Sequence, residues 1–363
     1  MKTLINKFNS DKTFKQNTIT YAIVIVAYIL CQSLIMGGVM SNSMKGLLIQ
    51  FCYYIIMAVS LNLTVGILGE LCLGHAGFMC IGAFTGAILY KTLGEVLTFK
   101  PLLLLICIVA GALLAGLFGF LIGIPVLRLK GDYLAIVTLA FGEIIKNVCA
   151  AVFLGKDSKG FHISLKDQAA LNLEDSGEMI IKGPLGITGL SFTVSFTACV
   201  ILVLITLIIV LNLVNSRTGR AVMAIRDNRI AAEATGINVT KYKMLAFTVS
   251  AALAGVAGVL YASSLSTLAS SSKNFGYNMS IMILVYVVLG GIGNIRGSVI
   301  ATVILVLLPE KLRFLSNYRM LIYAVVLIAM MLINWSPQAR AKRDVLLSKI
   351  NIFKKKTDDK EVQ

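Results

Sequence analysis

The sequence predicts an all-α polytopic membrane protein with about ten transmembrane spans. Hydrophobic residues make up 58% of the 363-residue chain and charged residues only 14%, and the mean hydropathy is +0.87. A soluble domain needs a polar surface and does not reach this balance. Apolar windows of about 20 residues, long enough to cross roughly 30 Å of hydrocarbon, recur along the whole length. The alternating pattern of about ten residues that marks an outer-membrane β-barrel does not appear.

The expected spans, two of them short, are 19–36, 46–66, 72–90, 101–127, 133–153, 190–214, 244–263, 280–292, 297–309 and 318–335. Three lysines, Lys7, Lys12 and Lys15, precede the first apolar run, which resembles a signal peptide. That run has no small-residue cleavage site and is as long as a span. We therefore expect an uncleaved first helix with its basic side in the cytoplasm.

The distribution of positive charge predicts the orientation. With a cytoplasmic N-terminus, the inside segments carry 21 Lys and Arg residues and the outside segments 11. This excess follows the positive-inside rule, so the formal net charge of +16 calls for no nucleic-acid partner. We expect a multi-pass protein of the cytoplasmic (inner) cell membrane with both termini inside. Its predicted parts are a cytoplasmic segment (1–18), a transmembrane domain (19–335) with an external loop (154–189) and a cytoplasmic loop (215–243), and a cytoplasmic basic tail (336–363).

Cysteine and histidine usage gives no sign of a metal site. The seven cysteines fall in or beside apolar runs without a CxxC pair, and there are only two histidines. A GxxxxGK[ST] phosphate loop is also missing, so the chain cannot hydrolyse ATP by that route. If transport is driven by ATP, a separate subunit must hydrolyse it.

Two glycine-rich stretches predict broken helices. One (63–78) opens the third span, and the other (287–298) closes the eighth, five spans later. Small residues in membranes allow close helix packing, or a break where protein covers the freed backbone. The spacing fits an inverted five-plus-five repeat with a path between the halves. The candidate path residues are Asn62, Thr64, Gly74, His75, Gly77, Gly290, Gly291 and Gly293.

Three ionisable residues within the apolar segments are candidates for a role: His75, Glu143 and Lys146. For His75 a role in the path and a purely structural hydrogen bond are both open. Glu143 and Lys146 are spaced i, i+3 on the fifth span and can neutralise each other on one helix face. Because a charged pair facing lipid is unfavourable, we expect this pair to be structural and to face the bundle or the outer interface.

A polar insert (217–243) separates the sixth and seventh spans. Four arginines lie in its first half, alanines give it helix propensity, and Gly236 is expected to end the helix. Such a helix can act as a rigid handle for a soluble partner. An ordinary positive-inside loop is the alternative.

The string SRTGRAVMAIRDNRIAAEATGINVTKYKMLAFTVSAALAGVAGVLYA (216–262) resembles the permease subunits of branched-chain amino acid ABC transporters of the LivM type. Segments 63–84, 127–147 and 278–310 match the same family in the same order. The resemblance implies that the cytoplasmic loop docks on an ATPase. It places the coupling motif at Glu233, Ala234 and Gly236, with Arg226 and Asp227 just before.

The resemblance also implies the partners: a sister permease of the LivH type, two ATP-binding cassette ATPases, an extracytoplasmic substrate-binding protein and the lipid bilayer. ATP-Mg would bind to the ATPases, and this chain would bind no cofactor. Cys72, Thr235 and Ala339 depart from the expected pattern, as does the stretch 154–164. These departures leave the fold and the coupling role in place but weaken the substrate assignment.

Two other functions remain open from the sequence. A permease for urea or short amides would look similar, because a pocket for an apolar side chain resembles ordinary helix packing. A stand-alone secondary transporter would need an ion-coupling group deep in the bundle, and only Glu143, Lys146 and His75 are available. A membrane enzyme is disfavoured, because no cluster of nucleophile, base and metal ligands is present.

Overall fold

The computed structural model describes residues 2–312, with gaps at 39, 95–96, 98, 130, 158–159, 169–170, 172–176 and 191–193, and isolated residues from 318 to 332. The chain forms two compact units, residues 1–302 and 303–363. The first unit contains the helix bundle and every site residue predicted from the sequence. The expected tenth span and the basic tail lie largely or wholly outside the described residues.

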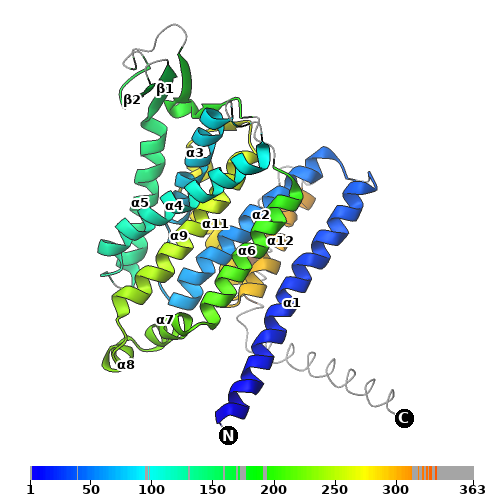
Figure 1. The fold of residues 1–363 in the computed structure, drawn as a ribbon, viewed down its shortest axis with the longest axis vertical. Helices are drawn as coiled ribbons and strands as arrows, with labels where there is room; N and C mark the ends of the chain where they lie inside the picture. The colour runs from blue at the N-terminus through cyan, green and yellow to red at the C-terminus, as the bar shows by residue number, and fades with distance from the viewer. Residues whose placement is uncertain are drawn as a thin grey trace. The chain divides into compact units, whose positions relative to one another are not determined.

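Helices make up most of the described chain (Figure 1). The long ones are α1 (Lys2–Met36), α2 (Asn42–Asn62), α3 (His75–Leu93), α4 (Lys100–Val126), α5 (Asp132–Ala151), α6 (Phe196–Asn215), α9 (Val239–Ser263), α11 (Tyr277–Gly290) and α12 (Ile295–Lys311). A π-helical turn, η1 (Leu63–Leu68), extends α2. The short helices are η3 (Gly183–Leu185), α7 (Arg217–Asp227), α8 (Arg229–Ala234) and α10 (Ser272–Phe275).

Seven of the described helices are long and apolar enough to cross a membrane. They correspond to the first seven expected spans. Two further helices, α11 and α12, lie at the expected eighth and ninth spans, but they have 14 and 17 residues. Both are shorter than the about 20 residues that a full crossing needs. The total of ten spans and the inverted repeat therefore stay predictions. The described part of the first helix is Lys2–Met36, so residues 2–18 of the predicted cytoplasmic segment and the first span form one continuous helix.

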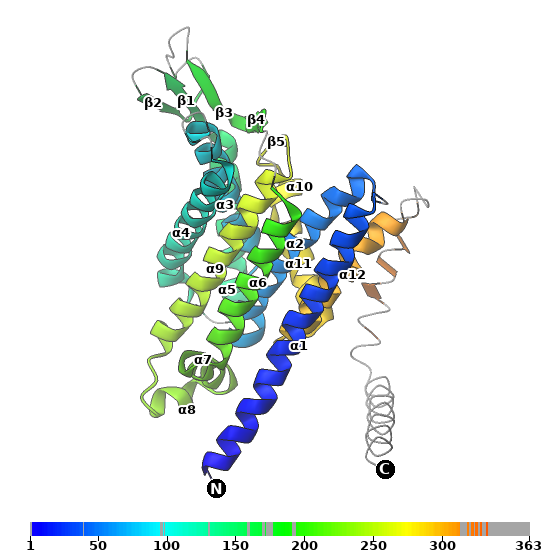
Figure 2. The same cartoon turned by 45° about the vertical axis from the view of Figure 1, so that its right-hand side comes forward.

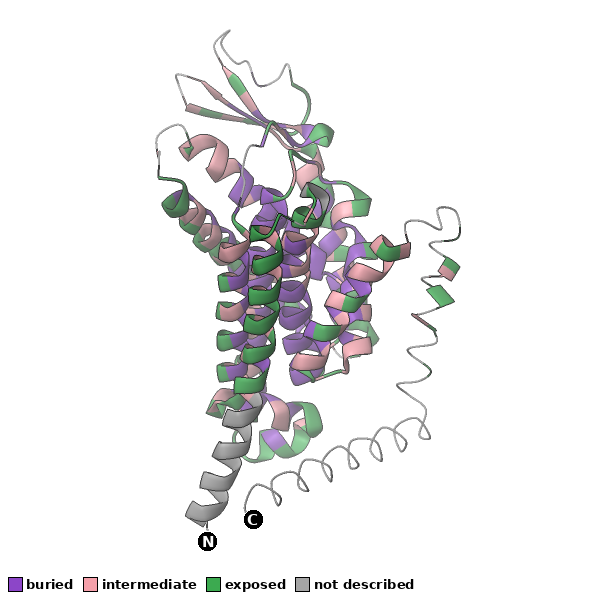
Figure 3. Ribbon diagram, turned by 90° about the vertical axis from the view of Figure 1, so that its right-hand side faces the viewer, coloured by how far each residue is buried: buried purple, intermediate pink, exposed green. Residues whose placement is uncertain are grey.

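The core lies between α2, α3 and α9, where 83%, 61% and 78% of the most apolar windows are buried (Figure 3). Small residues allow these helices to approach closely. For example, a Cβ placed on Gly82 of α3 would lie 2.1 Å from the carbonyl oxygen of Gly255 of α9. In contrast, only 6% of the corresponding window of α1 is buried. Its exposed isoleucines and leucines suit a lipid-facing surface.

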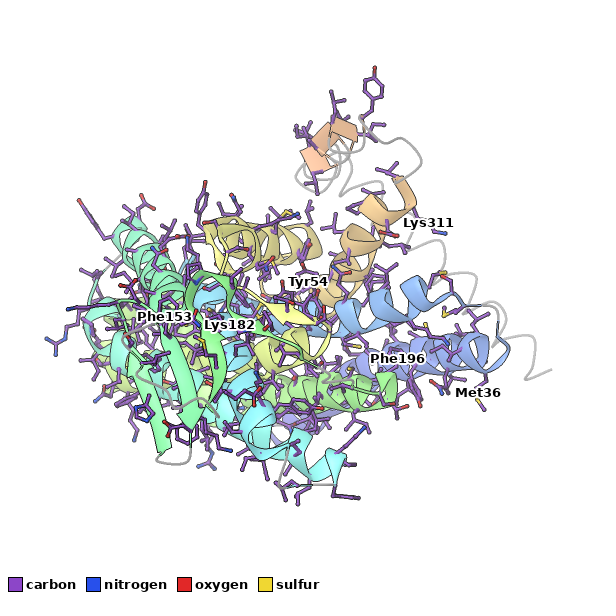
Figure 4. All side chains as sticks on the ribbon, turned by 90° about the horizontal axis from the view of Figure 1, so that it is seen from above. Met36, Tyr54, Phe153, Lys182, Phe196 and Lys311 are labelled. Atoms are coloured by element: carbon purple, nitrogen blue, oxygen red, sulfur yellow. The ribbon has the colours of Figure 1, made fainter. Side chains whose placement is uncertain are left out.

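The external loop predicted at 154–189 contains a small sheet. β1 (Phe153–Asp157) pairs antiparallel with β2 (Gly160–Ser164) and with β3 (Glu178–Lys182), in the order β2-β1-β3. Figure 4 shows Phe153 and Lys182, which are paired across β1 and β3, side by side. A second pair, β4 (Ile187–Thr188) and β5 (Thr267–Leu268), joins this region to the segment after α9. No strand was expected here from the sequence.

Two views place this sheet and the polar insert at opposite ends of the bundle (Figures 1 and 2). The strands lie at the upper end of both pictures, and α7 and α8 lie at the lower end. The assignment of the two segments to opposite sides of the membrane stays a prediction.

Candidate functional site

Two short helices, α7 and α8, form the polar insert, and we call the pair the elbow. Ser216, Asn228 and Asn238 begin α7, α8 and α9, and each side-chain oxygen accepts a hydrogen bond of 3.1 Å from the backbone N–H three residues later. These are N-caps, which satisfy one of the free amides at a helix start. The backbone of Asn228 is extended (φ −155°, ψ 105°), so it divides a segment that the sequence analysis expected to be one helix.

A left-handed glycine ends α8. Gly236 has φ +83°, its N–H donates to the carbonyl of Glu233 at 3.0 Å, and Ile237 N–H donates to the carbonyl of Ala232 at 3.1 Å. This pattern is the Schellman motif, in which glycine tolerates the positive φ. The helix therefore ends at the glycine expected from the sequence. Contact of Gly236 with an ATPase stays a prediction.

One face of the elbow is packed against the bundle. Val222 and Ile225 of α7 are buried, with 2% and 3% of their surfaces exposed. The first belongs to an apolar cluster with Leu63, Ile67, Leu68 and Ala246. The second belongs to a cluster with Ala232 and Val239. Apolar burial on both sides of Asn228 holds the two helices to the bundle.

The opposite face of the elbow is open. Ile230 of α8 is 79% exposed, and Ala234 beside it is exposed. Glu233 forms an ion pair across one helical turn with Arg229, whose Nε lies 3.0 Å from Glu233 Oε1. At half-exposed positions such a pair adds little stability. The predicted coupling residues Glu233, Ala234 and Gly236 are thus all exposed, at and just past the end of α8.

Arg226 points from the elbow towards the bundle. Its Nη1 donates to the carbonyl oxygen of Gly66 at 2.9 Å. Its Nε and Nη2 donate to Asp227 Oδ1 at 3.0 and 2.9 Å. The Asp227 carboxylate therefore orients the guanidinium through Nε and Nη2, and Nη1 is left to bond to the turn η1. The sequence assigned both residues to ATPase contact and gave no sign of this bond.

A buried ion pair lies next to this contact. Glu70 follows η1 and accepts a hydrogen bond from Lys243 Nζ of α9. Only 14% and 7% of the two side chains are exposed. The pairing could not be predicted from the sequence, because the two residues lie 173 positions apart, Glu70 in the glycine-rich stretch 63–78 and Lys243 at the end of the polar insert. The only available signal was an acidic residue inside a glycine-rich break.

The two predicted glycine breaks meet in space at Asn62. Its Oδ1 accepts from Gly293 N–H at 2.9 Å, and its Nδ2 donates to Ser298 Oγ at 2.9 Å. Asn62 is fully buried, so both ends of its amide are satisfied by the break between α11 and α12. The structure brings together Asn62 and Gly293, two of the candidate path residues.

The remaining candidates near this contact have backbone roles. Gly291 and Gly293 have φ of +96° and +81°, a region that favours glycine. A Cβ on Gly290 would lie 2.4 Å from the amide nitrogen of Ser298. The carbonyl of Thr64 accepts from the amides of both Gly69 and Glu70, which closes the turn η1.

The other group of candidates lies at the start of α3. His75 is buried, and its Nε2 lies 2.8 Å from Ser60 Oγ of α2. Ser60 donates its own hydrogen to the carbonyl of Met57, so it accepts from the histidine N–H. Gly74 and Gly77 approach α5: added Cβ atoms would lie 2.0 Å from the Thr138 oxygen and 2.8 Å from the Gly142 Cα. These contacts support packing between α2, α3 and α5, and a role in the path stays a prediction.

The predicted ion pair on α5, Glu143 and Lys146, also binds the segment before α11 and its first residue. Lys146 forms an ion pair with Glu143, and its Nζ also donates to Ser272 Oγ at 2.9 Å. Glu143 Oε1 accepts from the backbone N–H of Tyr277 at 2.9 Å. Ser270 Oγ donates to the carbonyl of Lys146 at 2.7 Å. The pair therefore faces the bundle and fixes α10 and the start of α11 to α5.

Removing the lysine should loosen this attachment. We expect Lys146→Met to lower the free energy of unfolding by about 2 kcal/mol, because it leaves the Glu143 carboxylate without its charged partner. Ser272→Ala removes one hydrogen bond and should cost about 1 kcal/mol. Unfolding by SDS titration in mixed micelles measures both. Equal losses for the two variants would show that the ion pair itself contributes nothing.

A groove of about 550 Å³ lies between α4 and the first turns of α9. Its lining residues are Phe120, Asn238, Thr240, Lys241, Met244, Leu245, Thr248 and Val249. None of them is a predicted path residue, so the groove is separate from the contact of the two breaks. Within the described part of the chain, no three His, Cys, Asp or Glu side chains lie together in a way that could hold a metal ion.

Comparisons with known proteins agree on one family. Residues 43–333 match the family described as branched-chain amino acid transport system, permease component. The chain is 34% identical to the high-affinity branched-chain amino acid transport system permease protein LivM of Salmonella typhimurium and 35% identical to that of Escherichia coli K12. Each match covers 78% of this chain and 67% of the relative. A ribose import permease protein, RbsC of Escherichia coli K12, is 32% identical over 33% of this chain and 39% of its own length. No solved structure matches the chain.

Proposed function

Because the chain belongs to the permease-component family of branched-chain amino acid transport systems, we propose that it is the transmembrane permease subunit of an ABC importer. The importer moves leucine, isoleucine, valine or related amino acids inward across the cytoplasmic membrane. The partners are a sister permease of the LivH type, two ATPases that bind ATP-Mg, and an extracytoplasmic binding protein that delivers the substrate. The chain itself binds no nucleotide.

The observation that carries this proposal is the elbow. It presents Ile230, 79% exposed, at the end of the bundle opposite the β1–β3 sheet. An apolar side chain on a short, capped helix is the kind of anchor that fills a pocket on a soluble domain. The positive-inside count assigns this end to the cytoplasm, where the ATPases lie.

The packing of the elbow supports the transmission of movement. Val222 and Ile225 bury the inner face of α7 against η1 and α9. The Schellman turn at Gly236 fixes the passage from α8 into α9. When ATP binding draws the ATPases together, the elbow moves with them as one rigid piece. The attached ends of α2 and α9 then carry this motion into the bundle core.

The test is uptake by the complete transporter in proteoliposomes. We expect Ile230→Asp to reduce ATP-driven uptake of labelled leucine by at least about tenfold, because a buried carboxylate opposes docking. Glu233→Lys and Gly236→Trp should abolish uptake and leave the chain in the membrane. The ATPases should no longer copurify with the Ile230 variant.

The matched control is Ile163→Asp on β2. This isoleucine is 70% exposed but lies at the sheet end of the bundle, so ATPase copurification should stay unchanged. Ion-driven uptake by the chain alone would refute the importer and establish a secondary transporter. Uptake of urea with no uptake of leucine would keep the importer and replace the substrate.

A further inference from the structure

Three segments of the chain meet at the carbonyl end of α2 and η1. The amides of Gly69 and Glu70, just past this helix, both donate to the carbonyl of Thr64. The last carbonyls of a helix have no amide partner within it, and together they form the negative end of its dipole. Gly66 contributes one of these carbonyls, and it faces both the elbow and the break between α11 and α12.

Arg226 supplies the positive charge at this helix end. Each of its three guanidinium nitrogens donates: Nη1 to Gly66 O, and Nε and Nη2 to Asp227 Oδ1. Its methylene stem lies on Gly69, where an added Cβ would be 2.5 Å from Arg226 Cγ. Each guanidinium nitrogen therefore makes a hydrogen bond within this chain, and the bond from Nη1 makes the side chain a cap on α2–η1.

Asn62 joins the same helix end to the second break. One turn before Gly66, its amide binds Gly293 N–H and Ser298 Oγ, both at 2.9 Å. An added Cβ on Gly66 would lie 2.0 Å from Asn62 Oδ1 and 2.3 Å from Gly293 N. Glycine at position 66 therefore permits the close approach that this hydrogen bond requires. The contacts run without interruption from the elbow, through Gly66 and Asn62, to α12.

We propose that Arg226 and Asn62 are positioning residues that tie the elbow to both glycine breaks, so that α7, the end of α2 and the α11–α12 break move as one unit. This inference rests on the proposed function, since the movement originates in the ATPases. A π-helical turn such as η1 is less regular than an α-helix and often occurs where a helix must change shape. Through the hydrogen bond from Arg226 to the Gly66 carbonyl, a displacement of the elbow moves this turn.

The experiment measures substrate transported per ATP hydrolysed by the complete transporter in proteoliposomes. Arg226→Gln should leave the ATPases bound and active and lower this ratio by about tenfold, the effect of losing one charge-assisted hydrogen bond at the point of transmission. Asn62→Leu should lower it similarly. Arg226→Lys, which keeps a charged donor for Gly66, should restore part of the ratio. The control is Arg220→Gln on the same helix, because that guanidinium donates to the nearby Asn215 carbonyl and not, among the described residues, to either glycine break.

The double variant Arg226→Gln with Asn62→Leu distinguishes one chain of contacts from two separate defects. If the contacts act as one series, the double variant transports no less substrate per ATP than the worse single variant. If the two defects are independent, their fold-losses in this ratio multiply. A multiplied loss overturns the proposal, and so does an unchanged ratio in Arg226→Gln. If the Arg226→Gln variant does not assemble, Ser298→Ala is tested in its place, and the substrate transported per ATP should fall by about threefold. An unchanged ratio in Ser298→Ala also overturns the proposal. Wild-type chain that neither binds ATPases nor transports would instead refute the proposed function.

Discussion

Replacing Lys243 by methionine is expected to destabilise the protein by about 3–5 kcal/mol, because it leaves the Glu70 carboxylate without a partner in a nearly dry site. The exposed fractions of the two side chains are 7% and 14%. Unpairing a buried charge is more harmful than losing both charges, since desolvation of the remaining ion is no longer compensated. SDS titration in mixed micelles gives the free energy of unfolding.

Two controls separate charge from packing. Lys241→Met changes an exposed lysine two positions earlier on the same helix and should shift the stability by less than about 0.5 kcal/mol. The double variant Glu70→Gln with Lys243→Met removes both charges and should recover most of the loss. A double variant as unstable as Lys243→Met would mean that the methylene packing of the lysine, and not its charge, stabilises this site.

Features encoded by neighbouring residues could be predicted from the sequence. Hydropathy windows located the seven described helices that are long and apolar enough to span, because a crossing needs about 20 apolar residues. The end of α8 followed from Gly236, whose lack of a Cβ suits the left-handed position. The division at Asn228 was available from the same kind of signal, since asparagine is a strong N-cap, but alanines on both sides favoured one helix.

Contacts between distant residues could not be predicted in this way. Arg226 and Gly66 lie 160 positions apart, and Asn62 and Gly293 lie 231 apart. A hydropathy pattern gives no register between helices, and the family resemblance placed Arg226 just before the coupling motif, as a residue for ATPase contact. Family resemblance located the coupling segment but could not show that this arginine faces inwards.

The structural role of each glycine could not be predicted from the sequence either. The sequence marked the glycine-rich stretches as candidate breaks, yet composition does not distinguish a turn from a packing contact. Gly291 and Gly293 have positive φ and form a turn, whereas Gly74 and Gly77 have ordinary φ and lie against α5. The difference lies in the backbone φ and in which element lies opposite, and both are determined by the folded arrangement.

Gly82→Ala is expected to destabilise the bundle by about 3 kcal/mol, because the new methyl group would overlap the backbone of α9. The added Cβ would lie 2.1 Å from the carbonyl oxygen and 2.5 Å from the Cα of Gly255. A helix backbone cannot rotate out of the way as a side chain can, so α3 and α9 must separate. That separation weakens the packing of the most buried part of the protein.

Gly46→Ala is the matched control for this substitution. It makes the same change within a membrane helix, but nothing lies within 4 Å of the added Cβ. Alanine has the higher helix propensity, so this variant should be more stable than the wild type by about 0.5–1 kcal/mol. Gly255→Ala provides an independent check, since its Cβ would lie 2.5 Å from both Ala115 Cβ and Gly111 O. If Gly82→Ala and Gly46→Ala unfold alike, α3 and α9 are not held together at this contact, and the glycines of α3 must serve another purpose.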